Sequence, residues 1–292
     1  MSIEKEMTQK HSTVVFGLGK TGLSCARFLA ARGVEFCVAD TREHPAGKNE
    51  LKRIFPDVNV FLGEIPREIL LNADQILLSP GIAPSNSLLD EARKSGVSII
   101  GDLEMFVQHC DKPIIAITGS NAKTTVTSLL GYLAAQCGKK MSVAGNIGTP
   151  MLDVLDDESE AYILELSSFQ LDLSENLQAL AATVLNISED HLDRYASMND
   201  YISSKQRIYR HAKNAVFNRA DKNTEPSADF CLNRISFGLD EPVSFADFGL
   251  LRNDGGKEYI ARGEVLLLPV DSLMLKGRHN LENVMAALAL GE

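Results

Sequence analysis

Residues 114–125 of this chain read IIAITGSNAKTT. The apolar start predicts a buried β-strand, and the turn that follows it leads into a helix. The backbone N–H groups of such a turn, together with the helix N-terminus, bind phosphate oxygens. Lys123 adds a positive charge near the β- and γ-phosphates, and the Thr124 hydroxyl can reach Mg²⁺. The stretch therefore predicts an α/β fold that binds ATP.

The match to the general phosphate-loop pattern G-x-x-x-x-G-K-[ST] is incomplete. Ile117 stands at the position of the first glycine, and Ala122 stands where a glycine precedes the lysine. An ordinary strand-to-helix turn without a ligand is therefore the alternative interpretation.

Length and composition limit the class of protein. The chain has 292 residues, enough for two domains, and 45% of them are hydrophobic while 23% are charged. No apolar run is long enough to cross a bilayer, and residues 1–10 lack the apolar core of a secretory signal. The five cysteines include no C-x-x-C pair, and a net charge of −10 argues against a nucleic-acid surface. We expect a cytoplasmic protein without nucleic-acid or membrane partners.

The order of predicted elements indicates two domains. Short β-branched runs alternate with helical segments, which is typical of βαβ units and parallel sheets. Residues 1–101 are expected to form a Rossmann-like domain, and residues 102–292 a P-loop-type α/β domain that binds ATP. Expected strands lie at residues 13–16, 35–39, 59–62, 75–79, 97–100, 114–118, 161–165, 183–186 and 215–218. Expected helices lie at residues 22–32, 87–95 and 281–290, and short β segments with glycine-rich turns are expected after residue 226.

A second phosphate-binding pattern lies near the N-terminus. Residues 17–22 read GLGKTG between the first strand and the first helix, and Asp40 ends the second strand. The glycines allow a tight turn and close approach of a phosphate, and an acidic residue at this distance typically accepts from a ribose hydroxyl. By itself the pattern predicts NAD. Other nucleotides also use this turn, and a helix N-terminus without a ligand is the remaining alternative.

Three further residues are candidates for a metal–nucleotide site. Glu165 and His191 each follow a strand that we expect beside the strand of the phosphate turn. Ligands of open α/β sheets bind beyond the carboxyl ends of the strands, so both side chains could reach a Mg²⁺-nucleotide. A carboxylate suits Mg²⁺, whereas a histidine hints at a second metal position. Lys205 lies among polar residues and, taken alone, reads as a solvated surface lysine.

Together these stretches resemble the ATP-dependent Mur ligases of peptidoglycan synthesis. The sequence TGSNAKTT at residues 118–125 is similar to the ATP loop of the whole family, which tolerates alanine at this position before the lysine. The sequences LELSSFQ at 164–170, EDHLDRY at 189–195 and DTR at 40–42 are most similar to the family member that adds D-glutamate. The resemblance runs nearly from end to end of the chain.

The resemblance implies an ATP-dependent amide ligase that adds D-glutamate to UDP-N-acetylmuramoyl-L-alanine. The alanyl carboxylate would take the γ-phosphoryl group of ATP to form an acyl phosphate, and the amine of D-glutamate would then displace phosphate. The Rossmann-like domain would hold the UDP of the sugar substrate and no nicotinamide. The resemblance also implies two Mg²⁺ sites, and we expect a monomer.

The resemblance assigns roles to individual residues. ATP would be bound by Gly119, Ser120, Asn121, Ala122, Lys123, Thr124, Thr125, Asn280 and Asn283. The UDP-sugar would be bound by Gly19, Lys20, Thr21, Asp40, Thr41, Arg42, Ser79, Pro80, Gly81, Asn146 and His191. Mg²⁺ would be held by Thr124, Glu165, His191 and Lys205, the last after carbamylation by CO₂ has made it an anionic oxygen ligand. The catalytic residues would be Lys123, Glu165, His191 and Lys205.

One departure from the family concerns length. Mur ligases carry a third, C-terminal domain that binds the incoming amino acid, and this chain stops at Glu292. We therefore expect the 292-residue chain to bind the UDP-sugar without making an amide bond. Two alternatives stay open: a non-catalytic nucleotide-sugar binding module, and an NAD-dependent dehydrogenase, which would leave the ATP turn, Glu165 and His191 unexplained.

Overall fold

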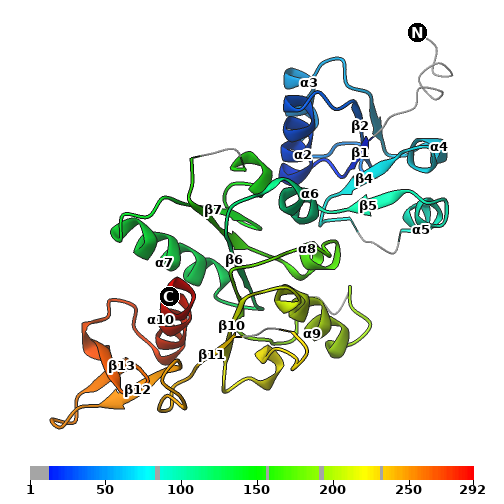
Figure 1. Ribbon diagram of the computed structural model, residues 1–292. Coiled ribbons are helices and arrows are strands. Elements are labelled where there is room, and N and C mark those ends of the chain that lie inside the picture. Colours follow the sequence, from blue (N-terminus) through cyan, green and yellow to red (C-terminus); the bar gives the residue numbers. More distant parts are fainter. Residues whose placement is uncertain (1–12, 83–85, 156–157, 191–193, 231–232) are drawn as a thin grey trace. The chain divides into compact units, whose positions relative to one another are not determined.

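The computed structural model describes residues 13–82, 86–155, 158–190, 194–230 and 233–292 (Figure 1). The chain forms two compact units. The first unit comprises residues 1–110, 150–156 and 173–175, and the second comprises residues 111–149, 157–172 and 176–292. Both units are built on largely parallel β-sheets with helices between the strands, which confirms the predicted α/β class.

The first unit contains a five-stranded parallel sheet with the order β3-β2-β1-β4-β5. Its strands are β1 (Thr13–Phe16), β2 (Phe36–Asp40), β3 (Val60–Leu62), β4 (Gln75–Leu78) and β5 (Ser98–Ile100). Its helices are α2 (Lys20–Ala31), α3 (Lys48–Ile54), α4 (Arg67–Leu71), α5 (Ser87–Lys94) and α6 (Asp102–His109). The sequence predicted these strands to within one residue at each end but did not predict α3 or α4.

The strand order of the first unit fixes where a ligand can bind. The chain builds outward from β1 to β2 and β3, and then returns to the other side of β1 with β4 and β5. In open α/β sheets, ligands bind beyond the carboxyl ends of the strands at such a reversal. The loops after β1, β2 and β4 therefore form the expected binding edge.

A distant segment completes the first unit. The 3₁₀ turn η1 (Met151–Asp153) lies far along the chain but belongs to this unit. Asp153 accepts hydrogen bonds from Ser24 Oγ at 2.9 Å and from the Arg27 guanidinium at 2.6 and 3.1 Å, and both donors lie on α2. The unit is thus not continuous in sequence, and it includes α6, which lies beyond residue 101.

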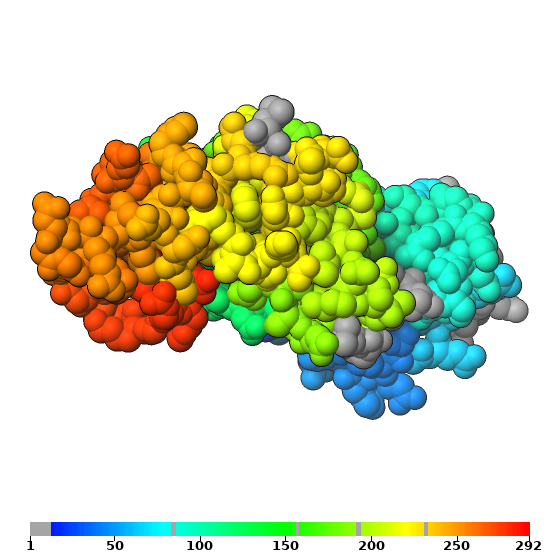
Figure 2. All heavy atoms as spheres, turned by 90° about the horizontal axis from the view of Figure 1, so that it is seen from below, coloured from blue at the N-terminus to red at the C-terminus, as the bar shows by residue number. Residues whose placement is uncertain are grey.

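The second unit contains a nine-stranded sheet with the order β14-β13-β12-β11-β10-β9-β6-β8-β7. Its strands are β6 (Ile114–Thr118), β7 (Met141–Gly145), β8 (Ala161–Glu165), β9 (Ala181–Val184), β10 (Asn214–Asn218), β11 (Asn233–Phe237), β12 (Phe248–Arg252), β13 (Glu258–Arg262) and β14 (Val265–Pro269). Strands β6 to β12 pair in parallel, and β12, β13 and β14 pair antiparallel. Figure 2 shows the β12–β14 segment, in orange, at one end of this unit.

The helices of the second unit are α7 (Lys123–Gln136), α8 (Ser168–Asp172), α9 (Met198–Gln206) and α10 (Arg278–Gly291). Short 3₁₀ turns follow at η2 (Arg207–Tyr209), η3 (Lys222–Thr224) and η4 (Val270–Ser272). Helices α7 and α10 lie side by side (Figure 1), and their apolar side chains join those of the central strands in one core. None of the described helices combines the length and the apolar character needed to span a membrane.

Strand β6 lies in the middle of the parallel part of this sheet. It is buried along its whole length, as expected for a strand covered on both faces. Its neighbours are β8 and β9, which confirms that the strands preceding Glu165 and His191 flank the strand of the phosphate turn. The sequence did not predict β7, and the strand expected at 183–186 ends at Val184 in the structure.

The hydroxyl of Tyr209 links three segments of the second unit. It is fully buried, accepts a hydrogen bond from Val184 N at 2.8 Å, and lies 2.9 Å from Val216 O and 3.1 Å from Thr224 O. Replacing Tyr209 with Phe leaves the Val184 N–H without this acceptor, so we expect a loss of about 2 kcal/mol of unfolding free energy. Urea unfolding of both proteins measures it, and an unchanged midpoint would contradict the role of the hydroxyl.

Candidate functional site

The predicted UDP-binding loops meet at one edge of the first unit. Residues 17–21 follow β1, residues 40–42 end and follow β2, and residues 79–81 follow β4, and these three strands are adjacent. Ser79 Oγ donates to Gly17 O at 2.8 Å. A Cβ on Gly22 would lie 1.9 Å from Gly17 O, so only glycine allows α2 to start this close to the turn. The sequence pattern thus forms the compact turn that a phosphate requires.

Asp40 organises this edge from within. Its side chain is fully buried, and Oδ2 accepts from Leu18 N at 2.6 Å while Oδ1 accepts from Arg42 N at 2.8 Å. The Arg42 guanidinium donates to both oxygens, at 2.7 and 2.9 Å. Burial alone would raise the pKa of Asp40, but the hydrogen bonds from Arg42 and Leu18 outweigh it and keep the pKa below its usual value. In this structure the carboxylate joins two loops, and the ribose contact expected from its spacing stays a prediction.

The Asp40 network gives a pH-dependent prediction. Because the carboxylate has a lowered pKa when folded, its stabilisation is fully present above the ordinary value of 3.8 and is lost as the pH falls through the folded pKa. We expect Asp40→Asn to lower the unfolding free energy by about 2 kcal/mol at pH 7. The difference from the unsubstituted protein should shrink below pH 3.8, which urea unfolding at pH 7 and pH 3 measures. An equal difference at both values would contradict it.

In the second unit, the phosphate turn joins β6 to α7. Lys123 Nζ lies on the turn itself, donating to Gly119 O at 2.8 Å and to Ser120 O at 3.0 Å. Burial lowers the pKa of Lys123, and the charges of Glu165 and Asp190 oppose this shift. Two N–H groups of the turn are already used, because Ser120 N donates to Asn186 O and Asn121 N to Asn186 Oδ1. The later N–H groups and Lys123 therefore remain the candidates for phosphate binding.

Glu165 connects two of the predicted site residues. It is the last residue of β8, is 1% exposed, and its Oε2 accepts from Thr124 Oγ1 at 3.0 Å. Its Oε1 accepts from Asn146 Nδ2 at 3.2 Å. A carboxylate and a hydroxyl are the hard oxygen ligands that Mg²⁺ prefers, so this pair fits a magnesium site. The structure thus brings Thr124, Glu165 and Asn146 together.

The prediction of a solvated Lys205, made from its polar neighbours, is wrong. Lys205 is 2% exposed, and its Nζ donates to Gly119 O at 3.0 Å and lies 4.7 Å from the centroid of the Tyr201 ring. Burial lowers the pKa of Lys205 to about 7, and the positive charge of Lys123 adds to the shift. The buried side chains of helix α9 are Tyr201, Ser204 and Lys205. Because this buried face mixes polar and apolar residues, the hydropathy of the sequence does not reveal it.

His191, the remaining predicted metal and substrate ligand, lies outside the described residues. In the part of the chain that the structure describes, no group of three or more His, Cys, Asp and Glu side chains gathers as a metal centre. The metal-binding, substrate-binding and catalytic roles of His191 stay predictions, as do the other residue assignments.

A cavity of about 390 Å³ lies beside the phosphate turn. It brings Ala122 and Thr125 of the turn region together with Asn280 and Asn283 of α10, although these residues are more than 150 positions apart in the sequence. Within it, Asn218 Nδ2 donates to Glu282 Oε1 at 3.0 Å. The cavity can accommodate a nucleoside next to the turn that is expected to hold its phosphates. Predicted ATP residues from two ends of the domain thus line one space.

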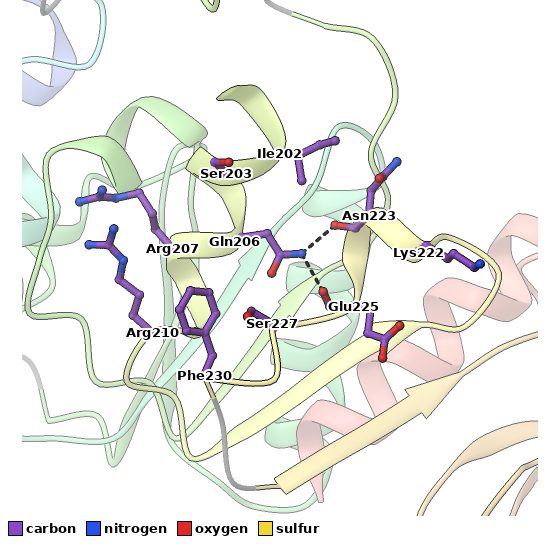
Figure 3. Close-up of a pocket in the computed structure, with 10 residues that line it drawn as sticks. All are labelled: Ile202, Ser203, Gln206, Arg207, Arg210, Lys222, Asn223, Glu225, Ser227 and Phe230. Carbon is purple, nitrogen blue, oxygen red and sulfur yellow. Dashed lines mark hydrogen bonds between the residues drawn. The ribbon is translucent and has the colours of Figure 1, made fainter. Parts of the chain in front are cut away.

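Sequence reasoning missed several residues of this cavity. The missed lining residues are Leu185, Asn186, Asn218, Phe237, His279 and Glu282. Asn186 and Asn218 end or follow predicted strands at the same sheet edge as Thr118, and this shared position could have identified them. A second hollow of about 440 Å³, between α9 and the segment after η3, contains none of the predicted site residues (Figure 3).

Comparisons with known proteins agree with both units. Residues 11–101 match a family model described as the MurD-like N-terminal domain of Mur ligases, and residues 117–291 match the Mur ligase middle domain. The chain is 49% identical over 281 residues to the UDP-N-acetylmuramoylalanine–D-glutamate ligase of Pseudomonas fluorescens. The match covers 96% of this chain and 62% of that relative, so the chain spans less than two thirds of the relative's length.

Solved structures show the same fold. A ligase from Neisseria meningitides, titled UDP-N-acetylmuramate:L-alanyl-gamma-D-glutamyl-meso-diaminopimelate ligase, aligns with a TM-score of 0.63 at 17% identity, covering 97% of this chain and 93% of that one. A MurF ligase from Thermotoga maritima, solved in complex with ADP, aligns with a TM-score of 0.51 at 17% identity over 98% of this chain and 60% of that one. At 17% identity these two structures support the fold of the chain and no statement about its function. The middle-domain model matches residues 117–291, which is more than half of this chain. The chain therefore belongs to the Mur ligase family.

Proposed function

We propose that this chain carries the UDP-sugar and ATP sites of an enzyme that joins D-glutamate to UDP-N-acetylmuramoyl-L-alanine in peptidoglycan synthesis. The observation that carries the proposal is the grouping of Lys123, Thr124, Glu165 and Lys205 around one phosphate turn. The name of the relative at 49% identity specifies the substrates. Because the reaction consumes ATP, we place it in the bacterial cytoplasm.

The proposed reaction is a phosphoryl transfer followed by an amide-forming displacement. The alanyl carboxylate attacks the γ-phosphorus of ATP, ADP leaves, and the resulting acyl phosphate is attacked by the amine of D-glutamate, with release of phosphate. Lys123 stabilises negative charge on the phosphate oxygens, and the turn holds the phosphates in line with the carboxylate. Bound Mg²⁺ would neutralise the charge that develops on the β- and γ-phosphate oxygens. Glu165 and Thr124 supply hard oxygen ligands for it.

Lys205 is the residue that we propose to be carbamylated. Its amine attacks CO₂ and loses a proton, which gives a carbamate with two oxygens and one negative charge. The attack requires a neutral amine, and the buried position of Lys205 favours that form. A carbamate at this position offers oxygen ligands near Gly119 and Lys123, where a cation would otherwise repel a metal. His191 is the second proposed ligand there.

The first unit is proposed to bind the UDP portion of the sugar substrate. Residues 17–21, 40–42 and 79–81 meet at the carboxyl edge of its sheet. Asp40 is already occupied by Leu18 and Arg42, so it leaves no carboxylate oxygen unbonded for a ribose hydroxyl of NAD. The same bonds also close Asp40 to a ribose hydroxyl of UDP, so the choice of UDP over a nicotinamide dinucleotide rests on the name of the 49% identical relative and not on Asp40.

Binding is the property of this chain that tests the proposal directly. We would titrate the 292-residue chain in a calorimeter with UDP-N-acetylmuramoyl-L-alanine, with ATP and Mg²⁺, and with NAD in parallel. Saturable binding of the UDP-sugar and of ATP, with none of NAD, is the expected result. Binding of NAD alone would refute the proposal and favour a dehydrogenase.

A further inference from the structure

Ala122 has an unusual backbone conformation. Among the described residues it is the only one other than glycine with a positive φ, +65°, and it forms the N-cap of α7. This left-handed conformation brings the Cβ of an L-residue close to its own backbone and costs free energy. Strained residues of this kind persist where their surroundings fix them, and they concentrate at functional sites.

The side chain of Asn186 holds the residue immediately before Ala122. Asn186 Oδ1 accepts from Asn121 N at 2.8 Å, and Asn186 Nδ2 donates to Asn121 O at 3.1 Å. The backbone adds a third bond, from Ser120 N to Asn186 O at 2.9 Å. One carboxamide thus fixes both the N–H and the C=O of Asn121, as a neighbouring strand would.

The segment that carries Asn186 is itself held in place. Ser188 exchanges hydrogen bonds with Ser120, at 3.0 and 3.1 Å, and Asp221 Oδ2 accepts from Ile187 N at 2.9 Å. The turn that begins at Asp221 is fastened to α9, because Gln206 Nε2 donates to Asn223 O at 2.7 Å and to Glu225 O at 3.0 Å (Figure 3). The segment that carries Asn186 is therefore hydrogen-bonded to Ser120 and Asp221 and, through the turn at Asp221, to α9.

We propose that Asn186 is a positioning residue for nucleotide binding, acting through Asn121 to keep Ala122 in its left-handed conformation and the phosphate turn in its binding shape. The inference rests on the proposed binding of ATP at this turn. It differs from the role of a direct ligand, because the proposed effect passes through the two hydrogen bonds from the Asn186 carboxamide to Asn121.

The test uses Asn186→Ala alone and combined with Ala122→Gly. The single substitution removes two hydrogen bonds, and we expect ATP with Mg²⁺ to bind about 10- to 100-fold more weakly. Glycine at position 122 adopts a positive φ without strain, so the double variant should regain most of the affinity, to within about threefold of the Ala122→Gly protein. A lost direct contact would not be regained in this way.

The matched control is Asn214→Ala. Asn214 also donates from its carboxamide to a backbone carbonyl, Leu180 O at 2.8 Å. It lies at the amino end of β10, however, whereas the phosphate turn follows the carboxyl end of the parallel strand β6. We expect ATP affinity to be unchanged in this variant. Because these residues lie in the second unit, urea unfolding of each variant, compared with that of the unsubstituted chain, reports whether this unit is folded.

Hydrogen exchange separates this inference from the proposed function, because it needs no nucleotide. Peptides that span residues 119–124 should exchange about tenfold faster in Asn186→Ala and in the isosteric Asn186→Asp, which loses the donor to Asn121 O. Unchanged exchange in both variants, or unchanged ATP affinity in Asn186→Ala, would overturn the inference. So would failure of Ala122→Gly to restore affinity. If the unsubstituted chain does not bind ATP, but residues 119–124 still exchange faster in the Asn186 variants, the proposed function fails. The role of Asn186 in holding the phosphate turn is then supported.

Discussion

Replacing Lys123 with alanine is expected to weaken the binding of ATP by about 100-fold or more, a loss of about 3 kcal/mol. The ammonium group of Lys123 lies on the phosphate turn, where it donates to Gly119 O and Ser120 O. Its half-buried position makes the attraction to phosphate oxygens stronger than it would be in water. No other side chain of the turn itself carries a positive charge.

Titration of the variant with ATP and Mg²⁺ measures the loss, and Lys139→Ala is the matched control. Lys139 lies just beyond the other end of α7 and forms an exposed ion pair with Glu160 at 3.6 Å, so its removal should change ATP affinity by less than about twofold. Binding of the UDP-sugar should be the same in both variants. If Lys123→Ala binds ATP as tightly as Lys139→Ala, the phosphates lie elsewhere.

Replacing Gly145 with alanine is expected to lower the unfolding free energy of the second unit by about 4 kcal/mol. Gly145 ends β7 with a φ of +122°, and a Cβ there would lie 2.2 Å from Glu165 O. The atom that it meets belongs to the backbone of a buried strand and cannot rotate away. The clash would also displace Asn146, whose N–H donates to Glu165 O at 2.8 Å.

Gly138→Ala is the matched control for this prediction. Gly138 also has a positive φ, +73°, but a Cβ there would meet nothing within 4 Å, so only the backbone cost of about 1 kcal/mol applies. Thermal unfolding should show a midpoint roughly 10 °C lower for Gly145→Ala and a much smaller change for the control. Equal losses in the two variants would mean that β7 moves away from β8 and avoids the clash.

Much of the architecture could be predicted because its signals are local. The β-branched runs of β1, β6 and β8 and the glycines of residues 17–22 specify strand and turn within a few positions of themselves. The short helices α3 and α4 and the half-exposed strand β7 lack such signals, and they were missed. Their formation depends on the strands beside which they pack.

The candidate site also contains some residues that the sequence located and others that only the structure located. The positions of Lys123, Thr124 and Glu165 follow from the strand that precedes each of them, because parallel strands bring their carboxyl ends to one edge. The sequence did not reveal the burial of Lys205 or the hydrogen bonds between Asn186 and Asn121. Lys205 bonds to Gly119, 86 positions away, and Asn186 bonds to Asn121, 65 positions away.

The sequence by itself therefore determined most of the parallel strands, the two phosphate turns and the family of the chain, since these depend on residue order over short spans. Only the tertiary structure decided which side chains lose their contact with water and which hydrogen-bonding groups are already used. The buried Lys205 and the occupied carboxylate of Asp40 are the two clearest cases. The physical reason is that desolvation and hydrogen bonding act through space, between elements that chain order does not place side by side.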